Sequence, residues 1–430
     1  MRMYYSRRGI LSAGVLAGAA AMAPRLAWAQ AAALAPDRMA NQKAFLDRWV
    51  GTGTGKFPGL VCSLGLPGQP TQYAIKGTEG FTDADVLAPD SLFRIYSMTK
   101  PITGMAAMQL IAEGKLALDQ PLADILPRYA KMQVQVTPDG SITDLRPAKS
   151  PITIRHLLTH TSGLGYSIVQ KGPLKTAFED AGLVPGLIGR NAPAGLFRGV
   201  SVRSLATFAD RLAEMPLVYE PGTQWSYSVG LDLLGRVIEV VSGQPFDQFL
   251  DRRIFQPCGM TSTFFQVPAS QAHRLTTGYA AFGGALVPID PGATSVFLDK
   301  PPFPFGGSGL VSSPRDYDRF LSMLAGHGRI DGKRVLGELA VRIGTSNLLP
   351  EGVPLPSTMG PPSHFGAGGR VGIGPEAGIF GWAGAAGTIG TVDMRRGLRS
   401  SLFVQFMPPQ AMPLLTEYQK ALRADVLALG

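Results

Sequence analysis

Apolar residues gather in short runs near the start of the chain and again near its end. Residues 59–66 read GLVCSLGL and residues 72–77 read QYAIKG, with the turn sequence PGQP between them. Short apolar runs bounded by glycine and proline are typical of strands, and a close turn between two of them predicts a hairpin. The same pattern predicts three further strands, at residues 378–384, 387–394 and 399–407.

Apolar residues with helical spacing fill most of the remaining chain. One helix is expected to begin near Ser97, with Gly114 at its C-terminal end. Residues 116–300 show helical patterns separated by long loops. The other helices are predicted at residues 38–50, 153–160, 201–215, 230–243, 246–255, 313–328 and 414–429.

This order of elements predicts an α/β (α+β) fold. An antiparallel sheet is built from both chain ends and flanked by helices, and a mostly helical region is inserted. We expect residues 30–115 and 301–430 to form the sheet part and residues 116–300 the helical part. Residues 348–377 are dense in glycine and proline and show no periodicity. They are expected to form a structureless lid or pocket wall.

Residues 1–29 have the features of an export signal. The sequence SRRGIL at residues 6–11 resembles the twin-arginine type, and an apolar stretch follows before AWA at residues 27–29. The apolar stretch is shorter than the roughly 20 residues of a stable membrane span. An uncleaved anchor is the alternative interpretation. We expect an exported protein, periplasmic or secreted, with no stable membrane span.

Charge and cysteine content narrow the possible partners. The formal net charge is +9, and removing residues 1–29 takes away four arginines and no acid, which leaves +5. Basic residues do not cluster with aromatic ones, so nucleic-acid binding is not expected. Cys62 and Cys258 both lie in apolar surroundings and are expected to be free and buried.

A serine and a lysine stand three residues apart where the helix near residue 97 begins, in Ser97-Met98-Thr99-Lys100. A serine hydroxyl is a weak nucleophile until a base takes its proton, and positions i and i+3 share one helix face. The N–H of Ser97 at the helix start also suits a developing oxyanion. A capping serine followed by a solvated lysine explains the same tetrad equally well.

Other stretches make the tetrad more specific. Together with it, they resemble the serine β-lactamase and penicillin-binding-protein superfamily, in the same order and over residues 40–410. They are ITIRHLLTHTSGLGY (152–166), YEPGTQWSYSVGLDLLGRVIE (219–239), GGSGLVSSPRDYDRF (306–320) and FGWAGAAGT (380–388). The resemblance implies a β-lactamase/transpeptidase-like fold.

The resemblance also implies roles for individual residues. Ser97 is the nucleophile, and Lys100 and Tyr227 form the base pair. Either a neutral Lys100 or a Tyr227 phenolate takes the serine proton, and the sequence leaves both open. The N–H groups of Ser97 and Ala385 are the expected oxyanion donors. Such chemistry needs no cofactor and no metal.

Two departures from the family pattern bear on the substrate. Trp382, in Trp382-Ala383-Gly384, stands where β-lactamases and peptidases usually have the lysine that binds a carboxylate. Val229 stands where they often have asparagine. The expected substrate pocket, which includes Gly384 and Tyr166 as well, therefore suits an uncharged small-molecule ester. The pattern is most similar to that of family VIII carboxylesterases.

Several alternatives stay open at this point. The same fold also supports a β-lactamase, a DD-peptidase or amidase, or an acyltransferase, and a penicillin-type sensor would acylate without turnover. His156 and His160 are spaced like metal ligands, but the glutamate of the zinc-protease motif is replaced by Leu157. We expect both histidines to have packing roles. The sequence predicts no oligomeric state.

Overall fold

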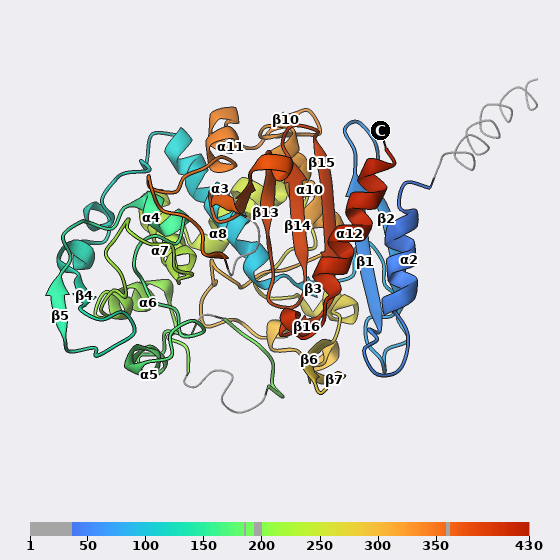
Figure 1. Ribbon diagram of the computed structural model, residues 1–430, viewed down its shortest axis with the longest axis horizontal. Helices are drawn as coiled ribbons and strands as arrows, with labels where there is room; N and C mark the ends of the chain where they lie inside the picture. Colours follow the sequence, from blue (N-terminus) through green and yellow to red (C-terminus); the bar gives the residue numbers. More distant parts are fainter. Residues whose placement is uncertain (1–36, 185, 193–199, 358–361, 430) are drawn as a thin grey trace, which may run out of the picture.

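The computed structural model describes residues 37–184, 186–192, 200–357 and 362–429. Within them, one seven-stranded antiparallel sheet brings the two ends of the chain together (Figure 1). Across the sheet the order is β11 (Ser363–Phe365), β12 (Arg370–Gly372), β13 (Ile379–Ala383), β14 (Ile389–Asp393), β15 (Leu398–Phe403), β1 (Gly59–Gly65) and β2 (Gln72–Gly77). The predicted α/β class and the sheet from both chain ends are confirmed.

Helices cover both faces of this sheet. Two terminal helices lie side by side on one face, and two helices from the interior of the chain pack against the other (Figure 1). The terminal pair is α2 (Ala40–Trp49) and α12 (Leu414–Leu427), and the interior pair is α3 (Thr99–Ala112) and α10 (Pro314–Ala325).

The centre of the sheet shows how its two faces are filled. In the pairing of β1 with β15, Val61 stands opposite Phe403 and Cys62 opposite Leu402. Successive side chains of a strand point to opposite faces. Val61 and Phe403 join the large core shared with α3, whereas Cys62 and Leu402 join the core under α2 and α12. All of β1 is buried, which is why its sequence is a mostly apolar run, interrupted only by Ser63, without alternation.

Helix α3 is the central helix of the molecule. Every residue from Thr99 to Leu110 is buried. On one side α3 meets the sheet at β13, and on the other it meets α7 (Gly230–Ser242) and α11 (Glu338–Gly344). The residues at the start of α3 are thus held between the sheet and the helical region.

The inserted region contains strands that the sequence pattern did not predict. The hairpin β4 (Gln133–Gln135)–β5 (Leu145–Pro147) and the hairpin β6 (Gly278–Phe282)–β7 (Ala285–Asp290) both fall within residues 116–300. β4 and β5 are three residues long, too short to show a period. The boundaries of the two predicted parts stay predictions. Besides α7, the region contains the α-helices α4 (Ile154–Leu158), α5 (Pro173–Asp180), α6 (Leu205–Leu212), α8 (Phe246–Leu250) and α9 (Gln256–Cys258), a π-helix (Asp251–Phe255) and short 3₁₀ helices.

The prediction that residues 348–377 lack structure was wrong. The segment contributes β11 and β12 to the edge of the sheet, next to β13. Each is a three-residue strand among glycines, so neither alternation nor length marked it as a strand. The remaining short strands are β3 (Phe93–Arg94), β8 (Val311–Ser312), β9 (Arg329–Ile330), β10 (Lys333–Arg334) and β16 (Phe406–Met407).

The other predictions about the chain have different outcomes. Cys62 and Cys258 are free and buried, as predicted. The expected export signal, residues 1–29, lies outside the described residues. Among the described residues, no helix is both long enough and apolar enough to cross a membrane.

A buried arginine fixes the strand that leads to Ser97. Arg94 on β3 is 1% exposed. Its Nε donates to Asp290 Oδ2 at 2.7 Å, and its Nη atoms donate to Thr276 O at 2.6 Å and Ser295 Oγ at 2.9 Å. Planar guanidinium groups suit such multiple bonds, and a buried charge needs them. Three residues before Ser97, the backbone is therefore tied to the end of β7.

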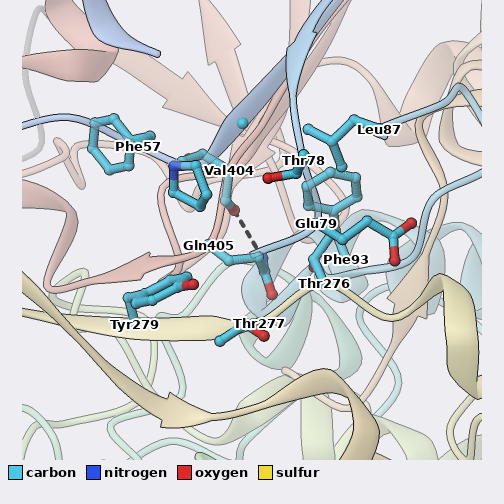
Figure 2. A pocket seen from close by; sticks show the side chains of 12 residues that line it. Phe57, Thr78, Glu79, Leu87, Phe93, Thr276, Thr277, Tyr279, Val404 and Gln405 are labelled. Carbon is cyan, nitrogen blue, oxygen red and sulfur yellow. Dashed lines mark hydrogen bonds between the residues drawn. The ribbon is translucent and has the colours of Figure 1, made fainter. Parts of the chain in front are cut away.

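A small pocket lies beside this region, between the start of β1, the end of β2 and β6. Its lining residues include Phe57, Thr78, Glu79, Leu87, Thr277, Tyr279 and Gln405 (Figure 2). Its volume of about 10 Å³ is near the minimum for one water molecule. It is too small for an organic substrate, and its described lining does not include Ser97, Lys100 or Tyr227.

Glu79 places a carboxyl group in the lining of this pocket. The residue is 4% exposed, and its Oε1 accepts from Ser91 Oγ at 2.8 Å. In the described part of the chain Oε2 has no hydrogen-bond partner. Loss of solvation on burial raises the pKa of Glu79 to about 7. The fold therefore favours the protonated form of this side chain.

Glu79 should make the stability of the protein depend on pH. Its pKa is 4.5 when unperturbed and about 7 in the fold, so its stabilising contribution is complete below about pH 4.5 and is lost as pH rises through 7. Glu79→Gln keeps the acceptor for Ser91 and does not ionise. At pH 8 the variant should exceed wild type in unfolding free energy by on the order of 3 kcal/mol, and near pH 4.5 the two should be similar.

Urea unfolding at pH 4.5, 6, 7 and 8 measures this difference. Glu351→Gln, which changes an exposed carboxylate, is the matched control and should follow wild type throughout. If the Glu79→Gln and wild-type curves stay parallel across this range, Glu79 is ionised in the fold and the account of its burial is incorrect.

Candidate active site

Ser97 lies on a tight turn that leads into α3. The turn is a 3₁₀ helix (Tyr96–Met98), and α3 begins two residues after Ser97. Tyr96 has a φ of 40°, which is unusual for a residue with a side chain, and it is 6% exposed. Ile95 is tied to Leu310 by a backbone hydrogen bond of 3.0 Å. The fixed backbone before Tyr96 and the buried start of α3 after Ser97 set the direction of the Ser97 side chain.

The hydroxyl of Ser97 receives hydrogen bonds from two residues. Tyr227 donates from its hydroxyl to Ser97 Oγ at 2.8 Å, and Lys100 donates from Nζ at 3.1 Å. Ser97 and Tyr227 are half-buried, whereas Lys100 is completely buried. The structure thus brings together the three residues that the sequence placed in the catalytic machinery.

The Nζ atom of Lys100 makes its direct contacts with neutral groups. Besides Ser97, its Nζ donates to Gly307 O at 2.8 Å. It also lies 4.5 Å from the ring centroid of Tyr227 and 5.9 Å from that of Tyr166. Ring faces attract cations at these distances. In the described part of the chain, no carboxylate lies within 4 Å of Nζ.

Tyr227 sits in an aromatic surround that holds its ring. The centroids of Tyr166 and His160 lie 5.4 Å and 4.7 Å from the Tyr227 ring. Trp382 on β13 donates from Nε1 to the Tyr227 hydroxyl oxygen at 3.3 Å. The phenol oxygen therefore accepts from Trp382 while it donates to Ser97.

His160 is completely buried and packs its ring against the ring of Tyr227. Its Nδ1 accepts from the backbone N–H of Ser228 at 3.2 Å and lies 3.0 Å from Ser228 Oγ. Burial, and then the charge of Lys100, lower the pKa of His160 well below its usual value, so the ring is neutral. His156 accepts from the N–H of Thr153 and closes a capping box. His160 thus has the packing role expected for it, whereas His156 caps a helix, a role that the sequence analysis did not predict.

The stretch Trp382-Ala383-Gly384 comes close to the turn that carries Ser97 through its glycine, Gly384. A Cβ added at Gly384 would lie 2.4 Å from Ile95 O, so only glycine permits this approach. Ala385 follows it and is exposed. Among the residues the structure describes, neither the N–H of Ser97 nor that of Ala385 has an acceptor in the protein. Their role as oxyanion donors stays a prediction, with which these free N–H groups agree.

The remaining predicted pocket residues differ in position. Tyr166 is 3% exposed and packs against Tyr227. Val229 is fully buried in the large core, just before α7. A contact between Val229 and substrate therefore stays a prediction, and the structure places its side chain among core residues.

The segment 348–377 does reach the site. Leu349, Val353 and Leu355 pack in one apolar cluster with Phe365 of β11 and with residues of the site. The members from the site are Trp225, Tyr227 and Trp382. The wall beside the Tyr227 hydroxyl is therefore apolar and aromatic.

Two residues of the site carried no signal that the sequence analysis used. Gly307 supplies the carbonyl that binds Lys100, and its N–H donates to the buried carboxylate of Asp232 at 2.8 Å. Asp232 is a lone acid in the apolar stretch GLDLL, five residues after Tyr227. A charged residue on the buried side of a helix is the signal that would have identified it.

No metal site emerges from the described residues. No group of three or more histidine, cysteine, aspartate or glutamate side chains there could hold an ion. What the arrangement provides is a serine hydroxyl between an amine and a phenol. This is the set of groups needed to activate a serine for attack on a carbonyl carbon.

Comparison with known proteins agrees with this chemistry. A family model described as Beta-lactamase matches residues 33–424. The chain therefore belongs to the beta-lactamase family.

Relatives within the curated proteins are of modest similarity. The chain is 37% identical over 267 residues to the protein Rv1367c of Mycobacterium tuberculosis, covering 61% of this chain and 62% of that protein. It is 32% identical over 285 residues to the esterase EstB of Burkholderia gladioli, covering 62% of this chain and 66% of EstB. The chain thus spans less than two thirds of the length of each relative.

Solved structures share the fold over nearly the whole chain. EstCE1, described as a hydrolase with promiscuous acyltransferase activity, has a TM-score of 0.71 at 23% identity, covering 89% of this chain and 99% of that one. Unliganded simvastatin synthase LovD of Aspergillus terreus has a TM-score of 0.71 at 22% identity, covering 92% and 99%. At these identities the likeness shows the fold alone.

The hydrogen bond from Trp382 to Tyr227 should affect the reactivity of Ser97. Trp382→Phe keeps an aromatic ring and removes the Nε1 donor, so phosphonylation of Ser97 by a fluorophosphonate probe should slow about 3- to 10-fold, the value of one hydrogen bond. Trp225→Phe is the matched control. Its ring also stacks on Tyr227, but its Nε1 has no partner among the described residues.

Rates of probe labelling, followed by intact-protein mass spectrometry, test this prediction. Equal slowing in the two variants would show that only packing matters and that the donor at Tyr227 has no role.

Proposed function

We propose that this protein is a carboxylesterase that hydrolyses uncharged esters with small or medium acyl chains through an acyl-enzyme on Ser97. The observation that carries the proposal is the shared hydrogen bonding of Ser97 Oγ by Tyr227 and Lys100. The names of EstB and of the lovastatin esterase of Penicillium rubens, 30% identical over 285 residues, support an ester as substrate.

The proposed reaction has two halves. Ser97 Oγ attacks the ester carbonyl while its proton passes to the Tyr227/Lys100 pair. The N–H groups of Ser97 and Ala385 hold the oxyanion, and the alcohol leaves with the proton from the pair. Water then attacks the acyl-enzyme with help from the same pair, which releases the acid and regenerates Ser97. No cofactor takes part in this scheme.

The preference for uncharged esters rests on the surroundings of the hydroxyl. Trp382 occupies the position where the related enzymes place a lysine, and its indole is turned to Tyr227. The neighbouring wall contains Leu349 and Phe365. In the described part of the chain the lysine that contacts Ser97 is Lys100, which is completely buried. A substrate carboxylate would lose its hydration there without gaining a partner.

Acyl transfer to a second alcohol is the second candidate. The acyltransferase calJ of Penicillium decumbens is 34% identical over 247 residues, covering 56% of this chain and 54% of calJ. An alcohol in place of water would attack the same acyl-enzyme. The two reactions differ in what enters after the first alcohol has left.

We also propose that the protein is exported, with cleavage after Ala29. The basic start, the apolar stretch and the AWA sequence support this.

An ester panel tests the function directly. Purified protein is assayed with p-nitrophenyl acetate, butyrate and octanoate, with a chromogenic cephalosporin, and with the butyrate plus a primary alcohol. Steady turnover of the short esters with little cephalosporin hydrolysis supports the esterase. A product ester supports acyl transfer, and a single stoichiometric burst indicates a sensor.

Ser97→Ala should abolish ester turnover, with a loss of at least about 10⁴-fold in kcat. The melting temperature should change little, because Ser97 lies on a half-buried turn. Ser346→Ala, at an exposed serine, is the matched control and should keep full activity. Ester hydrolysis that survives in Ser97→Ala would place the nucleophile elsewhere.

Trp382→Lys should move the preference toward esters that carry a carboxylate. An ammonium at this half-buried position is worth about 1 kcal/mol or less, so the ratio of kcat/KM for an anionic ester to that for its neutral analogue should rise up to about 5-fold. Trp382→Met removes the indole without adding charge and is the control. An unchanged ratio in the lysine variant would contradict this account of Trp382.

A further inference from the structure

Asp232 places a carboxylate in the interior of the site region. It lies in the first turn of α7 and is 1% exposed. Its Oδ1 accepts from the backbone N–H of Gly307 at 2.8 Å. Within the described residues its Oδ2 is buried and has no hydrogen-bond partner. A buried carboxylate with one oxygen unsatisfied is destabilising unless a nearby positive charge compensates for it.

Gly307 connects this carboxylate to Lys100. The N–H of Gly307 binds Asp232, and the carbonyl of the same residue accepts from Lys100 Nζ at 2.8 Å. A Cβ added at Gly307 would lie 2.6 Å from Asp232 Oδ2, so the contact depends on glycine. The preceding carbonyl, of Gly306, accepts from Thr103 Oγ1 at 2.7 Å and fixes the segment to α3.

The charges of Asp232 and Lys100 compensate each other across Gly307. Both residues are almost inaccessible to water, at 1% and 0% exposure. Burial raises the pKa of Asp232 to about 6, and the positive charge of Lys100 opposes this rise. At neutral pH the Asp232 carboxylate is therefore ionised. It lies next to Gly307, whose carbonyl binds Lys100 Nζ.

In the described part of the chain, the other titratable side chains that face Asp232 and Lys100 belong to two tyrosines and a histidine. Burial, and then the neighbouring Tyr227 and Asp232, raise the pKa of Tyr166 well above its usual value. His160 is kept neutral by burial and by Lys100. The hydroxyl of Tyr227 donates a hydrogen bond to Ser97 Oγ. Asp232 is thus the acid that compensates Lys100 within the described part of the chain.

We propose that Asp232 is a positioning residue of the Ser97 site: held by the Gly307 N–H, its carboxylate keeps the ammonium of Lys100 in place and protonated. The inference rests on the proposed function of Ser97 as the nucleophile. A fixed negative charge opposes the loss of a proton from the Lys100/Tyr227 pair. Asp232 therefore sets the pH above which the pair becomes a base.

The pH dependence of Ser97 reactivity tests this role. In Asp232→Asn the acceptor for the Gly307 N–H is kept and the charge is removed. The acid limb of the rate of labelling by a fluorophosphonate probe should move to lower pH by about one unit, since a nearby charge shifts a titration by about one to three units. The maximal rate should fall as well, because Lys100 is held less firmly.

The matched control is Asp316→Asn. Asp316 is also a buried carboxylate in the first turn of a helix, α10, where it accepts from the N–H of Ser262 and from Thr263 Oγ1. One of its oxygens is likewise unpartnered in the described chain. Its replacement should leave the acid limb at the wild-type pH. A general effect of losing a buried acid would shift both variants.

A second variant covers poor folding of Asp232→Asn. Gly307→Ala keeps every charge but displaces the carboxylate, so its acid limb should move in the same direction by a smaller amount. If folded Asp232→Asn or Gly307→Ala shows a lower rate with an unmoved acid limb, the role of Asp232 is merely structural and the proposal is overturned. Failure of the wild type to be labelled at Ser97 would instead overturn the proposed function.

Discussion

The site depends on the burial of one ammonium group. Lys100 has no exposed surface, and a charge in that position must be solvated by the protein itself. The Ser97 hydroxyl and the Gly307 carbonyl bind its Nζ, and the faces of two tyrosine rings lie beyond. These groups belong to separate parts of the chain. Solvation of Lys100 therefore requires the start of α3, the segment before β8 and the loop before α7 to converge.

The rest of the fold makes this convergence rigid. Helix α3 is buried along its first twelve residues and cannot shift without disturbing both the sheet and α7. Before it, Arg94 is bound to Asp290 and Thr276, and Tyr96, between Arg94 and Ser97, takes a strained φ of 40°. Strain of this kind costs about 1–3 kcal/mol and persists only where the surroundings fix it. The Ser97 turn is consequently preorganised in the free protein.

Some parts of this arrangement could be predicted from local patterns in the sequence, and others could not. The spacing of Ser97 and Lys100 follows from helix geometry alone, and the strands at both ends followed from their apolar runs. The approach of Tyr227 to Ser97 came only from the resemblance to a family, because no local pattern relates residues that are 130 positions apart. Asp232 is a lone acid in an apolar helix and could have been identified as buried, but its link to Lys100 depends on Gly307, whose N–H and carbonyl have no signature in a sequence. The strands in residues 348–377 were missed because they are three residues long.

Trp382 and the buried carboxylate of Asp232 together determine the electrostatic potential that a substrate would encounter beside Ser97. On the proposed role of Asp232, the charge of Lys100 is balanced inside the protein, so little positive potential is left over for a ligand. Trp382 then adds a donor that is directed at Tyr227 and adds no charge. A lysine at position 382 would leave one uncompensated cation beside Ser97, which suits a carboxylate-bearing substrate. The neutral character of this site thus follows from two residues on different elements, α7 and β13, and a change at either would alter the electrostatics that the other meets.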